Sequence, residues 1–202
     1  MANPFISPIS DSLKWLDSMK NKAVFLDRDG TLNEDTGYLY DYKDWRWLNG
    51  VAEGLAALSH SGYLLVIVSN QSGIARGFYE EKDWKRICKR INQDLESYNT
   101  RINGFYFCPH HPEITGDCDC RKPKPGLILK SSRELDIDIN KSWLIGDKES
   151  DIQAALAAGC KPILLDYSAN GDRIHELNAS IHICADFTCA VNTILNYDKQ
   201  PY

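Results

Sequence analysis

Ala23-Val-Phe-Leu-Asp27-Arg-Asp-Gly-Thr31 decides the fold, because four apolar residues are followed at once by two acids and a glycine. A compact apolar run of this kind suits a strand that is buried on both faces. Similar runs recur at 64–68, 104–107, 142–145 and 162–165. Candidate helices lie between and after them, at 51–61, 80–98, 125–135, 150–158 and 186–195, the last with Asp186 as its N-cap. This alternation predicts an α/β fold, a three-layer Rossmann-like sandwich with a mostly parallel sheet.

The length and composition favour one domain. A chain of 202 residues with 43% apolar residues can bury a single core. We expect that domain at 22–198, preceded by an N-terminal extension at 1–21 in which Ile9, Leu13 and Leu16 share a helical stripe.

Charge and hydropathy exclude several classes of protein. The net charge of −5 and the lack of a basic stripe disfavour binding to long nucleic acid. The longest apolar run, 63–68, is too short to span a bilayer, and the N-terminus lacks the pattern of a secretory signal. We therefore expect a cytoplasmic protein that binds neither membrane nor nucleic acid, and we expect a monomer.

Acidic residues follow two of the predicted strands, at the edge where ligands bind in such sheets. Asp27 and Asp29 could divide the roles of nucleophile and proton carrier. Asp147, after the strand at 142–145, could converge with them on a divalent cation, for which Mg²⁺ is the natural choice. Asp151 lies one helical turn further, and it could equally well cap that helix or orient the site.

Two loops could hold a phosphate. The loop after 64–68, with the sequence SNQSG, offers hydroxyl, amide and backbone N–H donors. The loop RKPKPG brings Arg121, Lys122 and Lys124 to the start of a helix. These cations could neutralise a transferring phosphoryl group and hold the rest of the substrate.

Three of the seven cysteines are crowded beside histidines, in the segments Cys108-Pro-His110-His111 and Cys118-Asp-Cys120. In a chain without a signal peptide, such crowding indicates a metal site rather than disulfides. Three thiolates and one imidazole form the closed tetrahedral set of a structural Zn²⁺ site, with His110 favoured by its spacing and His111 as the alternative. The zinc ion would fix the loop that precedes the cationic segment and take no part in the chemistry.

Taken in order, VFLDRDGT, VSNQSG, RKPKPG and IGDKESD resemble the four motifs of the haloacid dehalogenase (HAD) superfamily of Mg²⁺-dependent phosphatases. The resemblance covers about residues 22–165. It implies that Asp27 attacks phosphorus and forms an aspartyl-phosphate, while Asp29 protonates the leaving oxygen and then activates water. It also implies that Ser69 and Lys122 bind the phosphoryl group, with Lys124 as the lesser candidate.

The same resemblance implies how the metal is held. Asp147 would bind Mg²⁺ together with Asp27 and the backbone carbonyl of Asp29, and Thr31 would support the nucleophile loop. No insertion is long enough to form a large cap domain, so small loops would have to shield the site from water.

Within this superfamily, CPHH…CDCRKPKPG is similar to the zinc-bearing group of D,D-heptose 1,7-bisphosphate and histidinol-phosphate phosphatases. DTGY at 35–38 and SNQSGIARG are more similar to the heptose branch. The resemblance implies removal of the 7-phosphate from D-glycero-D-manno-heptose 1,7-bisphosphate, with Arg121 on the remote phosphate. Histidinol phosphate as substrate, a nucleic-acid 3′-phosphatase and an inactive zinc-stapled binding module are the alternatives. The implied substrate contacts are Arg28, Asp35, Thr36, Gly37, Tyr38, Asn70, Gln71, Ser72, Arg121 and Lys148.

Overall fold

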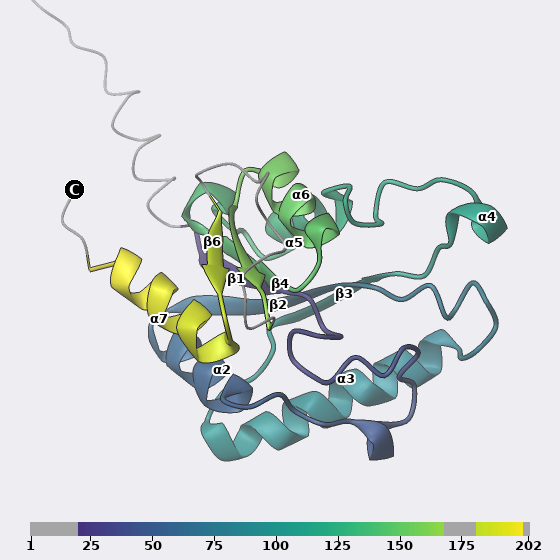
Figure 1. The fold of residues 1–202 in the computed structure, drawn as a ribbon, viewed down its shortest axis with the longest axis horizontal. Coiled ribbons are helices and arrows are strands. Elements are labelled where there is room, and N and C mark those ends of the chain that lie inside the picture. The colour runs from purple at the N-terminus through teal and green to yellow at the C-terminus, as the bar shows by residue number, and fades with distance from the viewer. Residues whose placement is uncertain (1–19, 168–180, 200–202) are drawn as a thin grey trace, which may run out of the picture.

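The computed structural model describes residues 20–167 and 181–199 and contains one six-stranded sheet (Figure 1). The strand order is β3-β2-β1-β4-β5-β6, and each neighbouring pair is parallel. This arrangement confirms the predicted α/β fold. The strands are β1 (Lys22–Leu26), β2 (Tyr63–Asn70), β3 (Gly104–Cys108), β4 (Trp143–Gly146), β5 (Lys161–Leu165) and β6 (His182–Cys184).

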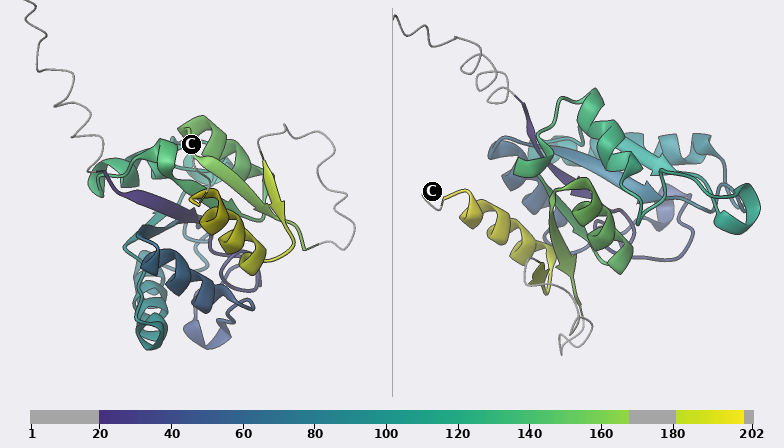
Figure 2. Two further views of the ribbon diagram at one scale, coloured as in Figure 1. Left: turned by 90° about the vertical axis from the view of Figure 1, so that its left-hand side faces the viewer. Right: turned by 90° about the horizontal axis from the view of Figure 1, so that it is seen from above.

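Helices cover both faces of the sheet, as Figures 1 and 2 show from three sides. One layer contains α2, α3 and α7, and the opposite layer contains α5 and α6. The helices are α2 (Val51–His60), α3 (Glu81–Leu95), α4 (Pro112–Thr115), α5 (Gly126–Glu134), α6 (Glu149–Ala158) and α7 (Phe187–Tyr197), with 3₁₀ turns η1 (Tyr42–Asp44), η2 (Glu96–Tyr98) and η3 (Ile139–Lys141).

Strand β1 shows why the sequence forms this sheet. Val24 and Leu26 pack into the core under α2, α3 and α7, whereas Ala23 and Phe25 pack under α5 and α6. All four side chains are fully buried. Since both faces of the strand are covered, its sequence is continuously apolar instead of alternating.

The element boundaries differ from the predicted ones at a few points. The helix predicted at 80–98 ends at Leu95, and the chain tightens into η2 before Asn99 adopts a left-handed conformation. Asp186 caps α7 as predicted, because its side chain accepts a hydrogen bond from the backbone N–H of Cys189 at 2.7 Å. Strand β6 was not predicted, since it has only three residues and two of them are exposed.

Two predictions concern parts of the chain that this structure describes only partly. The helical stripe at Ile9, Leu13 and Leu16 lies outside the described residues. The domain boundaries at 22 and 198 stay predictions. In the described segments, no helix combines the length and apolar character needed to cross a bilayer.

Candidate active site

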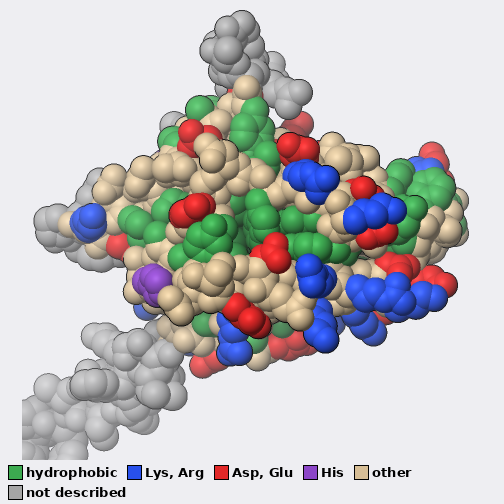
Figure 3. Space-filling view, turned by 90° about the horizontal axis from the view of Figure 1, so that it is seen from below, with side chains coloured by type: hydrophobic (Ala, Val, Ile, Leu, Met, Phe, Trp, Pro, Cys, Tyr) green, Lys and Arg blue, Asp and Glu red, His purple; other side chains and the backbone are tan. Residues whose placement is uncertain are grey.

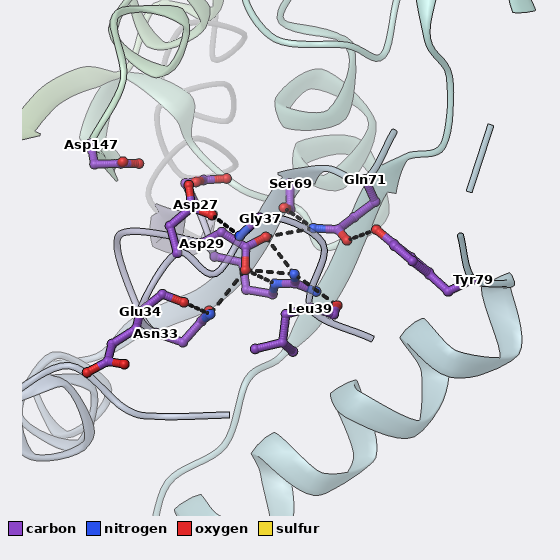
Figure 4. Close-up of polar contacts among 12 residues, drawn as sticks. Asp27, Asp29, Asn33, Glu34, Gly37, Leu39, Ser69, Gln71, Tyr79 and Asp147 are labelled. Atoms are coloured by element: carbon purple, nitrogen blue, oxygen red, sulfur yellow. Dashed lines mark hydrogen bonds and ion pairs between the residues drawn. The ribbon is translucent and has the colours of Figure 1, made fainter. Parts of the chain in front are cut away.

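The carboxyl ends of β1, β2 and β4 meet at one edge of the sheet, because these three strands are direct neighbours. A cavity of about 300 Å³ opens there, at the small end of the usual range for ligand pockets. Figure 4 shows side chains from all three strand ends around this point. The cavity is lined by Asp27, Asp29, Asp35, Gly37, Tyr38, Ser69, Asn70, Gln71, Ser72, Tyr79, Lys122, Lys148, Ser150 and Asp151.

Gly30 allows the turn after β1 to lie against the end of β4. Its φ of +83° belongs to the left-handed region, which favours glycine. A Cβ atom at this position would lie 2.3 Å from Oδ2 of Asp147. The glycine therefore serves both the turn and the close approach of the third acid.

Lys122 is the buried cation of the site, with 4% of its surface exposed. Its Nζ lies 2.5 Å from Oδ1 of Asp27 and 2.7 Å from Oδ1 of Asp151, and it also donates to the carbonyl of Val68. Burial lowers the pKa of Lys122, but the two carboxylates outweigh burial and hold that pKa above its ordinary value. Lys122 therefore stays charged and can neutralise phosphoryl oxygens.

The structure also distinguishes the alternatives left open for Lys124 and Asp151. Lys124 lies on the surface, where its Nζ pairs with Asp117 at 2.6 Å, so Lys122 is the lysine at the cavity. Asp151 performs both of its alternative roles, because Oδ2 accepts from the backbone N–H of Lys148 at the start of α6 while Oδ1 pairs with Lys122.

Three carboxylates could hold a divalent cation. Asp27, Asp147 and Asp151 each offer an oxygen, and these atoms lie within 4.8 Å of one another. Burial, and then the negative charge of Asp27, raise the pKa of Asp147 to about 7. Its Oδ1 atom is buried and accepts no hydrogen bond from the described residues. A crowded set of hard oxygen atoms of this kind fits Mg²⁺.

Asp29 is held from several sides. Its carboxylate accepts hydrogen bonds from Arg28 Nε and Nη2, from Asn33 Nδ2 at 3.1 Å and from Gln71 Nε2 at 3.2 Å (Figure 4). The sequence predicts Arg28 as a substrate contact, but its side chain is 1% exposed and does not line the cavity. Its Nε and Nη2 atoms donate to Asp29, and Nη2 also donates to the carbonyl of Leu39, so the structure does not place Arg28 against a substrate.

Three of the other predicted substrate contacts, Asn70, Asp35 and Lys148, bond to groups of the protein. The side-chain amide of Asn70 donates to the carbonyl of Lys122 and accepts from its N–H, so it fixes the backbone of the lysine loop. Asp35 and Lys148 form an ion pair at 3.0 Å across the cavity lining. Burial raises the pKa of Asp35, but hydrogen bonds from Lys148 and the N–H of Gly37 hold it below its ordinary value.

The remaining predicted substrate contacts divide into residues that line the cavity and residues that do not. Gly37, Tyr38 and Ser72 line the cavity, whereas Thr36 and Arg121 do not. Thr36 is exposed, and Arg121 donates from Nη1 to the carbonyl of His110 at 3.3 Å. Arg121 is thus tied to the cysteine-rich loop instead of reaching into the cavity.

The cysteine-rich loop brings four ligand atoms together, from Cys108, His110, Cys118 and Cys120. The three sulfur–sulfur distances are 3.0, 3.5 and 3.6 Å, and Nδ1 of His110 lies 3.3 and 3.6 Å from the sulfurs of Cys120 and Cys108. Ligands of a tetrahedral zinc ion lie roughly 3.5–3.8 Å apart. Three of these five distances match that spacing and the other two are shorter, so the four atoms are close enough together to bind one Zn²⁺. His111 lies apart and contacts Arg76.

Two cavity residues escaped the sequence prediction. Tyr79 and Ser150 line the cavity; Tyr79 belongs to none of the motifs, and Ser150 lies within IGDKESD but is not among the predicted site residues. Tyr79 reaches the site because the chain folds back after β2. A Cβ atom on Gly73 would lie 2.2 Å from the Tyr79 ring, so this close approach depends on a glycine that carries no such signal in the sequence.

Comparisons with known proteins agree with this geometry. Residues 22–199 match the family model described as polynucleotide kinase 3 phosphatase. The D-glycero-beta-D-manno-heptose-1,7-bisphosphate 7-phosphatase of Photorhabdus laumondii subsp. laumondii is 41% identical over 180 residues, covering 85% of this chain and 96% of that protein. The D-glycero-alpha-D-manno-heptose-1,7-bisphosphate 7-phosphatase of Burkholderia mallei is 41% identical over 161 residues, covering 77% of this chain and 85% of that protein.

A solved structure supports the same assignment. The D,D-heptose 1,7-bisphosphate phosphatase of B. bronchiseptica, complexed with magnesium and phosphate, has a TM-score of 0.78 and 30% identity to this chain. The match covers 87% of this chain and 99% of that one. This protein therefore belongs to the polynucleotide kinase 3 phosphatase family of HAD-type phosphatases, and it is an enzyme, a phosphoric monoester hydrolase.

Proposed function

We propose that this phosphatase removes the 7-phosphate from D-glycero-D-manno-heptose 1,7-bisphosphate, in the synthesis of nucleotide-activated heptose. The observation that carries the chemistry is the contact of Lys122 with Asp27 at a cavity lined by Asp29 and Ser69. The substrate is supported by relatives that act on either anomer of this sugar.

The positions of the side chains support the following reaction. A carboxylate oxygen of Asp27 attacks phosphorus, the bond from phosphorus to the sugar oxygen breaks, and Asp29 gives that oxygen a proton. Water then attacks the acyl-phosphate and loses its proton to Asp29, which frees Asp27 and phosphate. Lys122 and the Ser69 hydroxyl bind the oxygens that gain charge, so positioning and electrostatics carry the catalysis.

Each of two metals has its own proposed site. Asp27, Asp147 and the backbone carbonyl of Asp29 would hold Mg²⁺, which supplies positive charge to the phosphoryl oxygens when bound. The buried oxygen of Asp147 supports this assignment, and Asp151 is a further possible ligand.

The cysteine-rich loop would hold Zn²⁺ through Cys108, His110, Cys118 and Cys120. This ion would fix the loop that leads to Lys122. Because its three thiolates need a reducing compartment, we place the enzyme in the cytoplasm, and we propose that it acts as a monomer.

One observation favours a nucleic-acid 3′-phosphatase as the second candidate. The net charge and the lack of a basic stripe in the sequence disfavour nucleic acid, but helix α3 is locally basic. Its exposed face carries a row of basic residues, which Figure 3 shows interleaved with acids on the side of the molecule that contains α3. Two of them pair with neighbouring acids, Lys82 with Glu80 and Arg86 with Asp83, so the row is partly neutralised. The row comprises Lys82, Lys85, Arg86, Lys89 and Arg90.

Phosphate release with Mg²⁺ tests these candidates directly. The substrates would be both anomers of heptose 1,7-bisphosphate, histidinol phosphate and a 3′-phosphorylated oligonucleotide, with Asp27→Asn as the blank. We expect one heptose anomer to be preferred and the blank to be inactive. Preference for the oligonucleotide or for histidinol phosphate would reject the substrate and keep the mechanism, whereas full activity of Asp27→Asn would reject the mechanism.

A further inference from the structure

Gln71 has almost no hydrogen-bonding capacity left for a substrate. Its Nε2 donates to Oγ of Ser69 at 2.9 Å and to Oδ2 of Asp29 at 3.2 Å, and its Oε1 accepts from the Tyr79 hydroxyl at 2.5 Å (Figure 4). The residue is 2% exposed although it lines the cavity. Both N–H groups of the amide are therefore used on two groups of the proposed reaction.

The chemistry of the partners fixes the orientation of this amide. In the ionised form that acts as the base, the Asp29 carboxylate only accepts hydrogen bonds, so the end of Gln71 that faces it is the NH₂ group. The amide oxygen then faces Tyr79, whose hydroxyl has to donate. Burial raises the pKa of Tyr79 to about 12, so this hydroxyl keeps its proton throughout the range in which the enzyme works.

The same amide directs the Ser69 hydroxyl. Because Oγ of Ser69 accepts one N–H from Gln71, its own proton is free for an acceptor in the cavity, such as a phosphoryl oxygen. A single side chain thus orients a phosphate-binding donor and contacts the proton carrier.

Gln71 also differs from the other partners of Asp29. Arg28 and Asn33 hold the carboxylate from outside the cavity lining. Among the partners in the described residues, Gln71 is the one that faces the cavity, where a substrate would bind.

We propose that Gln71 is a positioning residue, which holds the Ser69 hydroxyl and the Asp29 carboxyl in register for phosphoryl transfer, and that the Tyr79 hydroxyl locks its amide. The proposal rests on the proposed phosphatase chemistry and does not depend on which sugar is the substrate. It gives Tyr79, which belongs to no motif of the sequence, a defined role.

The test uses p-nitrophenyl phosphate, whose leaving group departs without a proton. Formation of the acyl-phosphate then needs no acid, but its hydrolysis still needs Asp29 as a base. For Gln71→Leu we expect a burst of nitrophenolate approaching one equivalent, followed by a steady rate about 10²-fold below that of the native enzyme, without a rise in KM. A rise in KM at unchanged kcat would make Gln71 a substrate contact and overturn the proposal, as would an equal loss in both phases.

Tyr79→Phe is the milder variant, because it deletes one hydroxyl from a packed ring. We expect kcat to fall about two- to tenfold, the usual value of one hydrogen bond. As for Gln71→Leu, the loss should be in the steady rate that follows the burst. The matched control is Tyr106→Phe, whose hydroxyl bonds to exposed Glu134 outside the cavity lining. If the two tyrosine variants have the same activity, the role of Tyr79 is rejected.

Gln71→Glu adds a readout that a merely structural role would not move. It keeps the shape of the side chain and an oxygen that can accept from Tyr79 but removes the NH₂ group, so the burst should remain while the steady rate falls as for Gln71→Leu. A native steady rate in Gln71→Glu would contradict the contact. Native turnover and the Asp27→Asn blank are measured in the same assay, so loss of the phosphatase chemistry itself is distinguishable from failure of the Gln71 proposal.

Discussion

The described residues form two clusters of potential metal ligands, and the protein stabilises them differently. In the acidic cluster at the ends of β1 and β4, Lys122 stands between Asp27 and Asp151 and pairs with both. In the cysteine cluster, the described ion pairs and hydrogen bonds bring no Lys or Arg side chain to any of the three sulfurs. The first cluster has an internal cation and opens to a cavity, whereas the second is a closed set of four ligands.

This difference between the clusters corresponds to the difference between a catalytic and a structural metal site. A catalytic cluster must keep room for a substrate, so part of its negative charge is balanced by a lysine that can also bind the phosphoryl group. A structural cluster can give every position to a protein ligand, so the ion itself holds the loop. Loss of Mg²⁺ should therefore affect turnover first, and loss of Zn²⁺ should affect the stability of the fold first.

The largest expected effect comes from breaking the internal cation of the acidic cluster. Lys122→Met leaves Asp27 and Asp151 buried without their partner, which should cost about 3–5 kcal/mol of unfolding free energy. The loss of a charge-stabilising donor should also lower kcat about 10³-fold. Denaturant unfolding and phosphate release measure the two effects.

Lys124→Met is the matched control, because Lys124 belongs to the same loop but pairs with Asp117 on the surface. We expect native activity and a native unfolding curve. If Lys124→Met lost activity while Lys122→Met kept it, the assignment of the phosphate-binding lysine would be reversed.

Removal of both metals by a chelator, followed by separate return of each, tests the second half of the comparison. Without metal we expect no turnover, a lowered Tm and faster proteolysis within the loop at 108–120, since the loop would lose its four-ligand anchor. Zn²⁺ alone should restore Tm and protection from protease but not turnover.

The return of Mg²⁺ gives the complementary result. Mg²⁺ alone should restore part of the turnover, because Lys122 is also held by Asp151 and by the amide of Asn70. If Mg²⁺ alone restored the full Tm, the cysteine cluster would not be a structural metal site.

A smaller effect is expected at the turn that joins β1 to the acidic cluster. Gly30→Ala would strain a residue at φ +83° and push the Asp147 carboxylate aside. We expect kcat to fall about tenfold and the Mg²⁺ concentration for half-maximal activity to rise. Gly77→Ala is the control, because its φ is +73° but nothing lies within 4 Å of the added Cβ. It should cost about 1–2 kcal/mol of stability and leave the Mg²⁺ requirement unchanged.

The sequence predicts the parts of this fold whose pattern is local. Strands β1, β2, β4 and β5 contain continuous apolar runs because they are buried on both faces, and the edge strand β3 is apolar although only half-buried. The motifs at the strand ends follow from the sheet order. Strand β6 lacks this signal, since Ile183 is exposed and the strand has three residues. Pairings between distant segments, such as Lys122 with Asp151, depend on how the loops return and leave no mark in the sequence.

The direction of the Arg28 side chain could be predicted from its position between two acids. Side chains alternate in direction along an extended segment, so the residue between Asp27 and Asp29 should point away from both. In the structure its guanidinium group lies over the Trp84 ring at 5.3 Å, outside the cavity lining, and turns back to donate to Asp29 and to the carbonyl of Leu39. A charged residue between two acids of a strand end is thus better interpreted as a buried partner than as a substrate contact.

The smallest expected effect is the pH dependence of stability that Asp147 adds. Burial and the charge of Asp27 raise its pKa from 3.8 to about 7, so between these values the folded protein binds the proton more tightly than the unfolded chain. In protein stripped of divalent cations, stability should therefore fall as the pH rises from about 4 to 7. Asp147→Asn cannot ionise, so its Tm relative to the native protein should increase across this window, by roughly 2–4 °C for each kcal/mol of repulsion removed.

Mg²⁺ competes with the proton for the same oxygens, so it should stabilise the native protein more at pH 7 than at pH 5 and leave the variant nearly unchanged. A difference in Tm that stays constant with pH would show that Asp147 is already ionised at low pH, and that Lys148 and Lys122 balance the acidic cluster without a metal.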